Sequence, residues 1–340
     1  MKRLRVVIIG MGRMGQTRYE AMQRHGGYEI LAVCDSSPSC LSGYKGKTYV
    51  HWKECIDENH PDAVVVCTVN AAIPDIVCYA LQNGMAVFSE KPPGKTLQDA
   101  LRMKQTQEET GNILKFGFNH REHHSVIEAR ALIKSGILGK IVCVRGVYGK
   151  AGNSNFMNEW RNDPSQSGGG ILLDQGIHMI DLICYLTEND LHVKSSHVDN
   201  LVWKDMKTED SALAIMETDS GQLVSFHSSA VQWRHKFDMD IICTNGYIAL
   251  NGLLTSTRSY GIESITYYKK DLEMETGRLG KPKEYTMCFD EDFSWDIEMK
   301  EFYDAAVEGE AVVNGRPEEA VRVMRIIEEI YQKGKLNAEK

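Results

Sequence analysis

The sequence has no apolar run long enough to cross a membrane, no signal-peptide pattern and no surplus of basic residues. Every hydrophobic stretch falls short of the roughly 18 residues that a spanning helix needs. The apolar part of the start is only residues 6–9, and no small-residue cleavage site follows it. With 39 basic and 47 acidic residues the net charge is −8, which disfavours nucleic acid and anionic membranes. We expect neither as a partner.

Cysteine pairs and metal-ligand spacings are also missing. The nine cysteines are an odd number without a Cys-x-x-Cys pair, so they do not predict a disulfide framework. The run His120-Arg121-Glu122-His123-His124 matches no strong zinc pattern, and we expect no metal. The chain is predicted to be a reduced, cytoplasmic protein.

The length of 340 residues suggests about two domains. In the first part, short apolar runs alternate with helical patterns, which is typical of strands that helices cover on both faces. The expected strands are 4–9, 30–34, 63–67, 86–89 and 113–118. This alternation predicts a doubly wound parallel sheet, and hence an α/β domain, over residues 1–120.

Beyond residue 120 the pattern changes to a mixture of helices and paired strands. The expected elements are helices near 125–135 and 171–186, a strand at 141–148, and strands at 212–216, 223–229, 239–243 and 247–250. Turn signals at 219–221 and 244–246 separate the later strands, as in an antiparallel sheet. We therefore expect residues 121–340 to form an α+β domain that ends in two helices, the second beginning near Pro317.

A glycine turn directly follows the first expected strand. Gly10, Gly12 and Gly15 form a G-x-G-x-x-G pattern before a helical stretch. In such a turn the first glycine permits a tight bend, the second lets the backbone approach a pyrophosphate, and the third allows close helix–strand packing. The helix N-terminus offers amide donors to the phosphates. Asp35, 20 residues after Gly15 and at the end of the second strand, is placed to accept hydrogen bonds from the adenosine ribose.

The residues around Asp35 favour NAD as the cofactor. A carboxylate repels the 2′-phosphate of NADP, and Ser36 and Ser37 supply no arginine to hold it. NADP stays possible, because serine hydroxyls can still admit it. The other expected contacts within the turn are Met11, Arg13 and Met14. The alternative is that the glycines serve only a tight βα turn.

Two further segments carry residues suited to proton movement. Lys91, in Glu90-Lys91-Pro92, follows a strand at its carboxyl end, where ligands bind in doubly wound sheets. A lysine there can donate to a substrate oxygen, although a lone Lys-Pro is commonly a solvated turn. Asp174 and His178 are four residues apart on the apolar helix, so they share one face, and the imidazole can accept a proton near neutral pH. The alternative is a structural pair.

Trp160 and Arg161 lie just before the glycine run 168–170. An indole can cover the apolar face of a sugar ring, and an arginine can hold a phosphate with two hydrogen bonds. Ordinary packing and a solvated charge are the alternative.

These segments together resemble the glucose-fructose oxidoreductase, inositol dehydrogenase and MocA (Gfo/Idh/MocA) family. The resemblance rests on the glycine turn, on Glu90-Lys91-Pro92, on Gly117-Phe118-Asn119-His120-Arg121 and on residues 168–181. It implies a Rossmann domain followed by an α/β domain with an open, mostly antiparallel sheet. Because that second domain commonly mediates oligomerisation in the family, we expect a homodimer or homotetramer.

The resemblance also implies roles for single residues. Lys91 matches the lysine that contacts the reacting oxygen and the nicotinamide, His178 matches the proton acceptor, and Asp174 matches the acid that positions the substrate. Arg121 falls near the nicotinamide and the substrate in the matching segment, so it is an expected substrate contact, as are the three residues just named. Trp160 and Arg161 are expected substrate contacts on the chemistry of their side chains.

The chain departs from the family pattern after residue 67. Where family members often have Thr-Pro-Asn followed by a histidine, this sequence reads Thr68-Val69-Asn70-Ala71-Ala72-Ile73. Thr68, Asn70 and Glu90 remain expected cofactor contacts. No role is carried over to Ile73, because its side chain cannot form hydrogen bonds.

The predicted function is an NAD(P)-dependent dehydrogenase or reductase that acts on a hydroxyl-bearing carbon of a sugar, inositol, sugar phosphate or nucleotide sugar. Three alternatives stay open. They are a glycoside hydrolase of the same family that retains its NAD, a non-catalytic dinucleotide sensor, and a purely structural protein. Lys91 together with Asp174 and His178 argues against the sensor.

Overall fold

The computed structural model describes residues 2–152, 159–270 and 283–334. The chain divides into two compact units. The first combines Met1–Asn119, Asp163–Gly169 and Phe293–Arg325, and the second combines His120–Asn162, Gly170–Asp292 and Ile326–Lys340. The expected boundary at residue 120 coincides with the first change of unit. The first unit also includes a C-terminal segment, which the sequence pattern assigns to the second domain.

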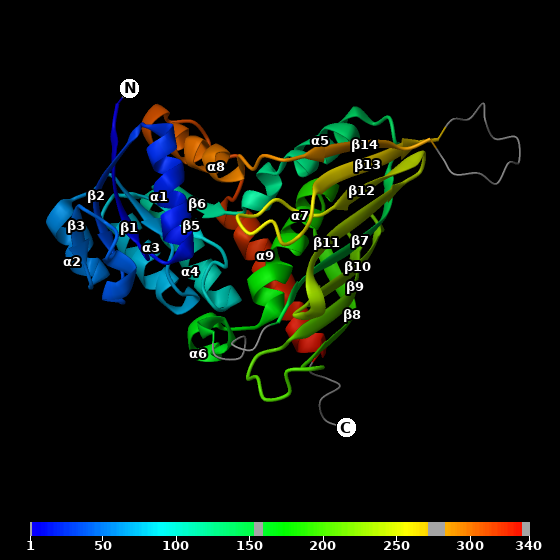
Figure 1. Ribbon diagram of the computed structural model, residues 1–340, viewed down its shortest axis with the longest axis horizontal. Coiled ribbons are helices and arrows are strands. Elements are labelled where there is room, and N and C mark those ends of the chain that lie inside the picture. The colour runs from blue at the N-terminus through cyan, green and yellow to red at the C-terminus, as the bar shows by residue number, and fades with distance from the viewer. Residues whose placement is uncertain (1, 153–158, 271–282, 335–340) are drawn as a thin grey trace, which may run out of the picture. The chain divides into compact units, whose positions relative to one another are not determined.

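The first unit is built on a parallel sheet of six strands (Figure 1). The strands are β1 (Leu4–Ile9), β2 (Tyr28–Cys34), β3 (Lys47–Tyr49), β4 (Ala63–Val66), β5 (Ala86–Glu90) and β6 (Leu114–Gly117). Their order is β3-β2-β1-β4-β5-β6, and every neighbouring pair is parallel. This confirms the predicted doubly wound fold. The sequence pattern missed β3, because its three residues lie at the sheet edge and none is fully buried.

Helices connect and cover these strands. In the first unit they are α1 (Arg13–His25), α2 (Trp52–Asn59), α3 (Ile73–Gln82), α4 (Leu97–Thr110), α6 (Pro164–Ser167) and α8 (Ser294–Tyr303). Local signals define several of their ends. Thr96 and Asp99 form a reciprocal capping box at the start of α4, which satisfies two backbone donors of its first turn. Helix α9 (Pro317–Gly334) contributes residues to both units.

The C-terminal helix α8 belongs to the first unit because its apolar face completes that unit's core. Met299, Phe302 and Tyr303 are buried in one cluster with residues of β1, α1 and β5. The Tyr28 hydroxyl donates a hydrogen bond to the Met299 carbonyl at 2.6 Å. The sequence pattern predicts the apolar face of this helix but not the surface that it covers.

A buried arginine joins α1, β5 and α8. The fully buried Arg18 donates from Nε to Glu90 Oε1, and its Nη2 lies against Glu298 Oε2, both at 2.6 Å. The Phe88 and Trp295 rings flank its guanidinium at 4.4 and 4.6 Å. Burial raises the pKa of the Glu298 carboxyl to about 7, although the charges of Arg18 and Lys115 act in the opposite direction. One guanidinium thus compensates two buried carboxyl groups.

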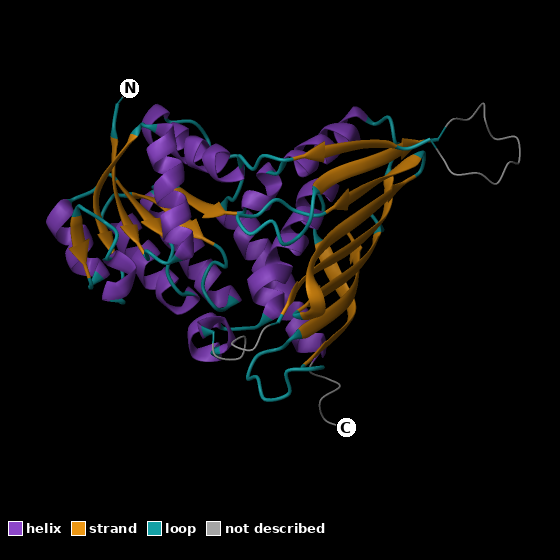
Figure 2. Cartoon of the chain, in the orientation of Figure 1, coloured by secondary structure: helices purple, strands orange, loops and turns teal. Residues whose placement is uncertain are grey.

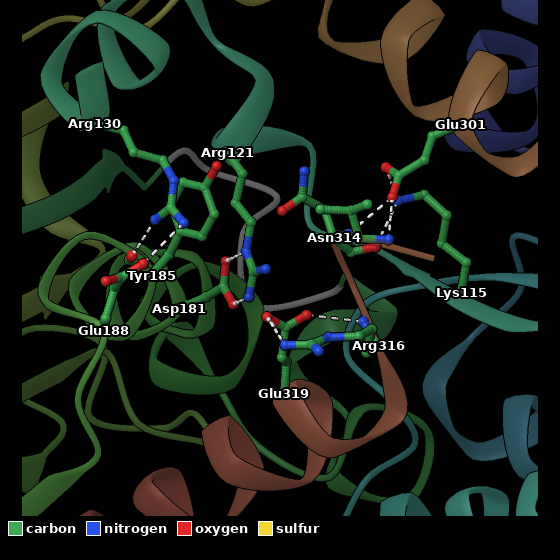
Figure 3. A network of polar contacts seen from close by, with 11 residues as sticks. Lys115, Arg121, Arg130, Asp181, Tyr185, Glu188, Glu301, Asn314, Arg316 and Glu319 are labelled. Atoms are coloured by element: carbon green, nitrogen blue, oxygen red, sulfur yellow. Dashed lines mark hydrogen bonds and ion pairs between the residues drawn. The ribbon is translucent and has the colours of Figure 1, made fainter. Parts of the chain in front are cut away.

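A second buried cation, Lys115 of β6, ties the same C-terminal segment to the sheet. Its Nζ donates to Glu301 Oε2 and to the Asn314 carbonyl, each at 2.6 Å. Figure 3 shows both contacts around the lysine ammonium. The Phe116 amide also donates to the Gly315 carbonyl at 2.7 Å. The segment therefore docks through charge and backbone contacts as well as through apolar packing.

The second unit is built on an eight-stranded, mostly antiparallel sheet (Figure 2). Its strands are β7 (Ile141–Ala151), β8 (Leu191–Asp199), β9 (Ser211–Thr218), β10 (Leu223–Ser229), β11 (Val231–Cys243), β12 (Gly246–Asn251), β13 (Glu263–Lys269) and β14 (Tyr285–Phe289). The order is β14-β13-β12-β11-β7-β10-β9-β8, and only β7 and β10 pair in parallel. The open antiparallel sheet is confirmed.

Helices α5 (His124–Ser135) and α7 (Ile177–Thr187) pack against this sheet. Several large apolar side chains of β9 and β10 remain exposed, among them Leu213, Ile215 and Leu223. Trp233 and Arg234 lie within β11, in an irregular stretch where Trp233 has a φ of 53°. No helix within the described ranges has the length and hydrophobicity of a membrane-spanning segment.

The Arg18 contacts predict a large and specific loss of stability in Arg18→Ala. This change leaves Glu90 and Glu298 buried without their cation, which should cost about 3–5 kcal/mol of unfolding free energy in urea titrations. Arg24→Ala is the matched control. Arg24 lies on the same helix and pairs with Asp296 of α8 in a solvent-accessible position, so its loss should cost at most about 1 kcal/mol. Equal losses in the two variants would contradict this interpretation.

Candidate active site

The three glycines of the turn between β1 and α1 differ in the space around them. Gly10 has a φ of +97°, and a Cβ there would lie 2.4 Å from the Cys67 carbonyl oxygen. A Cβ on Gly15 would lie 1.9 Å from the Gly10 carbonyl oxygen, whereas one on Gly12 would meet nothing within 4 Å. Gly10 and Gly15 are therefore required by the backbone, and Gly12 leaves open space beside the turn.

This open space lies where a doubly wound sheet binds its ligand. Strands β1 and β4 are neighbours at the point where the strand order reverses, and the turn follows the carboxyl end of β1. Helix α1 begins at Arg13 with Gly12 as its N-cap, and its first turn carries no acidic residue. The amides at this helix end are thus suited to an anionic group such as a pyrophosphate.

Asp35 joins the glycine turn to the end of β2. Its Oδ2 accepts a hydrogen bond from the Met11 amide at 2.7 Å, and its Oδ1 accepts one from the Ser37 amide at 2.8 Å. The side chain is only half-buried, and Ser36 beside it is exposed. The carboxylate is held in place by two backbone donors and remains accessible to a ribose.

The remaining predicted site residues of the first unit differ in their burial and in their contacts with other residues. Asn70 is buried and donates from Nδ2 to the Ser167 carbonyl at 2.8 Å. Glu90 is buried against Arg18, so its carboxylate has a structural role. Lys91 follows directly, is half-buried and precedes Pro92 through a cis peptide bond. Thr68 is half-buried after β4.

In the second unit a buried carboxylate anchors the helix that carries Asp174 and His178. Glu209 accepts hydrogen bonds from the Gly170 and Leu172 amides, both at 2.9 Å, and from the Tyr331 hydroxyl at 2.8 Å. Burial raises the pKa of Glu209, although these donors oppose the shift. The helix opens with a π-helical turn, Leu172–Gly176, before α7 begins, which the sequence pattern does not predict.

His178 is buried in a group of aromatic side chains. Its ring stacks on that of His120, with centroids 3.7 Å apart and planes 13° apart. His120 Nε2 lies 2.9 Å from the Tyr148 hydroxyl, and burial raises the pKa of Tyr148 well above its ordinary value. The sequence alone predicts no role for His120 or Tyr148. The only available signal was the position of His120 in the segment 117–121.

Asp174 lies between two cations. Its Oδ2 is 3.1 Å from Lys150 Nζ, and its Oδ1 is 3.3 Å from Arg161 Nε. Arg161 also lies over the Trp160 ring, 4.5 Å from the ring centre. The structure therefore brings together three residues that the sequence analysis singled out, namely Asp174, Trp160 and Arg161, and adds Lys150.

Both halves of the chain match models of a single protein family. Residues 4–118 match the model described as "Oxidoreductase family, NAD-binding Rossmann fold", and residues 126–249 match the one described as "GFO/IDH/MocA C-terminal domain". The chain belongs to the Gfo/Idh/MocA family. This confirms the resemblance drawn from the sequence motifs.

Curated relatives in the Gfo/Idh/MocA family include dehydrogenases of sugars and inositols. The chain is 32% identical over 194 residues to D-glucoside 3-dehydrogenase of Escherichia coli (strain K12), a match that covers 54% of each chain. It is 24% identical over 263 residues to scyllo-inositol 2-dehydrogenase (NAD(+)) of Bacillus subtilis (strain 168), and this match covers 74% of each chain. The chain thus spans about half the length of the first of these relatives.

Solved structures share the complete fold. Levoglucosan dehydrogenase in complex with NADH matches with a TM-score of 0.85 at 18% identity, over 98% of both chains. An oxidoreductase domain protein from Kribbella flavida has the same TM-score and identity, over 99% of this chain and 98% of its own. At this level of identity the likeness establishes the fold.

Arg121, which the family resemblance places near the nicotinamide and the substrate, is engaged in a buried ion pair. It is fully buried and donates from Nε and Nη2 to Asp181 Oδ2 and Oδ1, at 2.8 and 2.5 Å. The Tyr185 ring lies 4.8 Å from its guanidinium. Figure 3 shows the Arg121 guanidinium facing the Asp181 carboxylate. A guanidinium that is engaged in this way holds α7, rather than presenting its donors to a substrate.

The histidine-rich segment 120–124 is used for three separate contacts. His120 meets Tyr148, His123 Nδ1 lies 2.8 Å from Glu263 Oε2, and His124 stacks on Phe289. Within the described residues, no group of three or more His, Cys, Asp or Glu side chains is arranged to hold a metal ion.

A hollow of about 580 Å³ lies on the other face of the second sheet. Arg145 and Val147 line it. Because side chains alternate along a strand, these two lie opposite to Tyr148. None of the predicted site residues lines this hollow. It is therefore separate from the candidate site around Asp174 and His178.

The contact between His123 and Glu263 predicts a pH-dependent stability. Burial acts to raise the pKa of Glu263, but His123 and the Ser125 and Leu254 amides outweigh it and lower the pKa to about 2. The ionised Glu263 therefore contributes about 3 kcal/mol to the free energy of unfolding at pH values above its ordinary pKa near 4.5. This contribution is lost as the pH falls towards 2. Urea unfolding between pH 6 and 2 should show this loss in the wild type.

Glu263→Gln should remove this part of the pH dependence. Glu217→Gln is the control, because Glu217 pairs with Lys194 at a solvent-accessible position, and it should keep the wild-type profile. A Glu263→Gln profile parallel to the wild type would refute the assignment.

Proposed function

We propose that this chain is an NAD-dependent dehydrogenase or reductase acting on a hydroxyl-bearing carbon of a sugar, an inositol or a derivative of either. The observation that carries the proposal is that one chain contains both an open dinucleotide turn, with Asp35 held beside it, and a helix that presents Asp174 and His178. The names of the relatives agree, since they include a D-glucoside 3-dehydrogenase and a scyllo-inositol 2-dehydrogenase.

The residues of the first unit fit a dinucleotide. The N-terminal amides of α1 and the space beside Gly12 suit the pyrophosphate, and the Asp35 carboxylate suits the adenosine ribose. When bound, the nicotinamide supplies the carbon that accepts or donates hydride. Thr68 and Lys91 follow the carboxyl ends of β4 and β5, the edge of the sheet where ligands bind.

The protein's own groups would handle the proton and the substrate oxygens. His178 would accept the hydroxyl proton as the carbon is oxidised, Asp174 would accept a hydrogen bond from a neighbouring hydroxyl, and Lys91 would donate to the reacting oxygen as its charge develops. Stacking on His120 restricts the His178 ring to one orientation. The exposed apolar side chains of β9 and β10 support a homodimer or homotetramer.

Asp35→Asn should shift cofactor preference towards NADP. The change removes the negative charge that repels a 2′-phosphate but keeps the shape of the side chain and one acceptor for the backbone amides. We expect the ratio of kcat/KM for NADP to that for NAD to rise about 10-fold, equivalent to about 1.4 kcal/mol of relieved repulsion. An unchanged ratio would show that Asp35 does not face the ribose.

Lys91→Ala and His178→Ala should separate catalysis from cofactor binding. We expect NADH formation from sugars, followed at 340 nm, to fall by about 10²–10⁴-fold. Stabilisation by NAD in thermal unfolding should persist. Lys104→Ala is the control, since Lys104 pairs with Glu108 on the outside of α4, and it should retain turnover.

The outcomes also discriminate between the alternatives. Release of a free sugar from a glycoside without net NADH would support the NAD-retaining hydrolase. Full turnover in both site variants would refute the assigned roles. NAD binding without turnover of any polyol would support the sensor, and no thermal shift with either dinucleotide would support a structural protein.

A further inference from the structure

We propose that Arg161 and Lys150 form a subsite for an anionic group of the substrate, so that the preferred polyol carries a phosphate or a carboxylate. This inference rests on the proposed dehydrogenase function and specifies the class of substrate within it. Both residues belong to the second unit and lie outside the segments on which the family resemblance rests.

Arg161 has donor groups that no residue in the described ranges uses. Its Nε faces Asp174 and its guanidinium lies over Trp160. In the described parts of the chain, its two terminal nitrogens have no hydrogen-bond or ion-pair partner. The side chain is 37% exposed, so a ligand can reach part of it. Two N–H donors in one plane match the oxygens of a phosphate or a carboxylate.

The surrounding charge favours an anion over a neutral ligand. Lys150 and Arg161 both contact the carboxylate of Asp174, and these three groups together carry one more positive than negative charge. Lys150 and Asp174 are largely buried, at 14% and 19% side-chain exposure. Because water screens a partly buried charge less than an exposed one, an anionic substrate group gains more from pairing here than at the surface.

The arginine is also held in place before any ligand binds. Trp160 and Arg161 belong to one short 3₁₀ turn, Trp160–Asn162, whose last residue is buried. The indole under the guanidinium restricts its tilt, and the contact with Asp174 fixes its Nε edge. Less side-chain freedom is therefore lost when an oxyanion binds.

The subsite lies on the same side of the second sheet as the proposed proton acceptor. Lys150 is two residues after Tyr148 in β7, so both side chains point to one face. Tyr148 contacts His120, whose ring stacks on His178. Asp174 and His178 also come from one helical segment. A substrate that contacts both would place its charged group and the carbon that is oxidised on the same side of this sheet.

Further polar side chains lie near Lys150. Burial lowers the pKa of His235, and the positive charge of Lys150 lowers it further. The His235 ring meets Tyr260 edge-on at 4.8 Å, and the Tyr260 hydroxyl donates to Gln175 Oε1 at 3.0 Å. Such donors and acceptors suit the hydroxyl groups of a sugar ring. The site thus combines polyol-binding groups with a positively charged end.

The test compares matched ligands that differ in charge, using the full chain. Glucose, glucose 6-phosphate and glucuronate share one ring and separate the neutral, phosphate and carboxylate cases. Binding is measured by calorimetry in the presence of NAD, and kcat/KM by NADH formation. We expect at least one charged sugar to bind 10-fold or more tightly than glucose. Raising NaCl from 50 to 500 mM should weaken only the charged ligands.

The variants assign this preference to the two cations. Arg161→Gln and Lys150→Gln should each lower the ratio of charged-to-neutral affinity by 10-fold or more, and Arg161→Lys should restore part of it. Arg145→Gln is the control. Arg145 is exposed on the opposite face of the same strand, where it pairs with Asp240, and the ratio should not change.

Two failures are distinguishable. Equal binding of charged and neutral sugars, or an equal loss for both in Arg161→Gln, overturns the anion subsite whether or not NADH forms. Selective binding of charged sugars without any NADH formation supports the subsite and contradicts the proposed dehydrogenase function instead.

Discussion

The placement of Asp174 and His178 depends on one buried carboxylate. Glu209 holds the amides of Gly170 and Leu172, which are the first donors of the helical segment that carries both residues. A Cβ on Gly170 would come within 2.2 Å of the Glu209 carbonyl oxygen, so only glycine allows this approach. Tyr331 contributes a third donor from α9. The C-terminal helix is therefore coupled to the geometry of the site through a single hydrogen-bonded group.

In the first unit, too, a buried charged side chain holds an element that carries a candidate site residue, but here the charge is positive. There a buried cation, Arg18, holds Glu90 at the end of β5, immediately before Lys91. The partner carboxylate Glu298 comes from α8, nearly 300 residues after the strand that begins the sheet. In both units a segment close to the C-terminus thus stabilises the element that carries a candidate catalytic residue.

Local patterns in the sequence predicted the sheets but not the tertiary contacts. Continuous apolar runs define strands that are buried on both faces, so β1 was predicted to the residue, whereas the exposed edge strand β3 carries no such signal. The spacing of Asp174 and His178 indicated a shared face. It did not indicate Lys150 or His120, which reach the same group of side chains from β7 and from the turn after β6. Those contacts depend on how the elements pack, which a single sequence does not specify.

Arg121 illustrates how a motif residue can serve a site without facing its ligand. Its pairing with Asp181 links the turn after β6 to α7, and both partners are fully buried. His120 precedes it in the chain, and His178 precedes Asp181 by less than one helical turn. The ion pair therefore holds the two backbones that carry the stacked imidazoles at a fixed separation. Loss of the pair would therefore change how the His178 ring lies against His120, because the stacking depends on the separation of these two backbones.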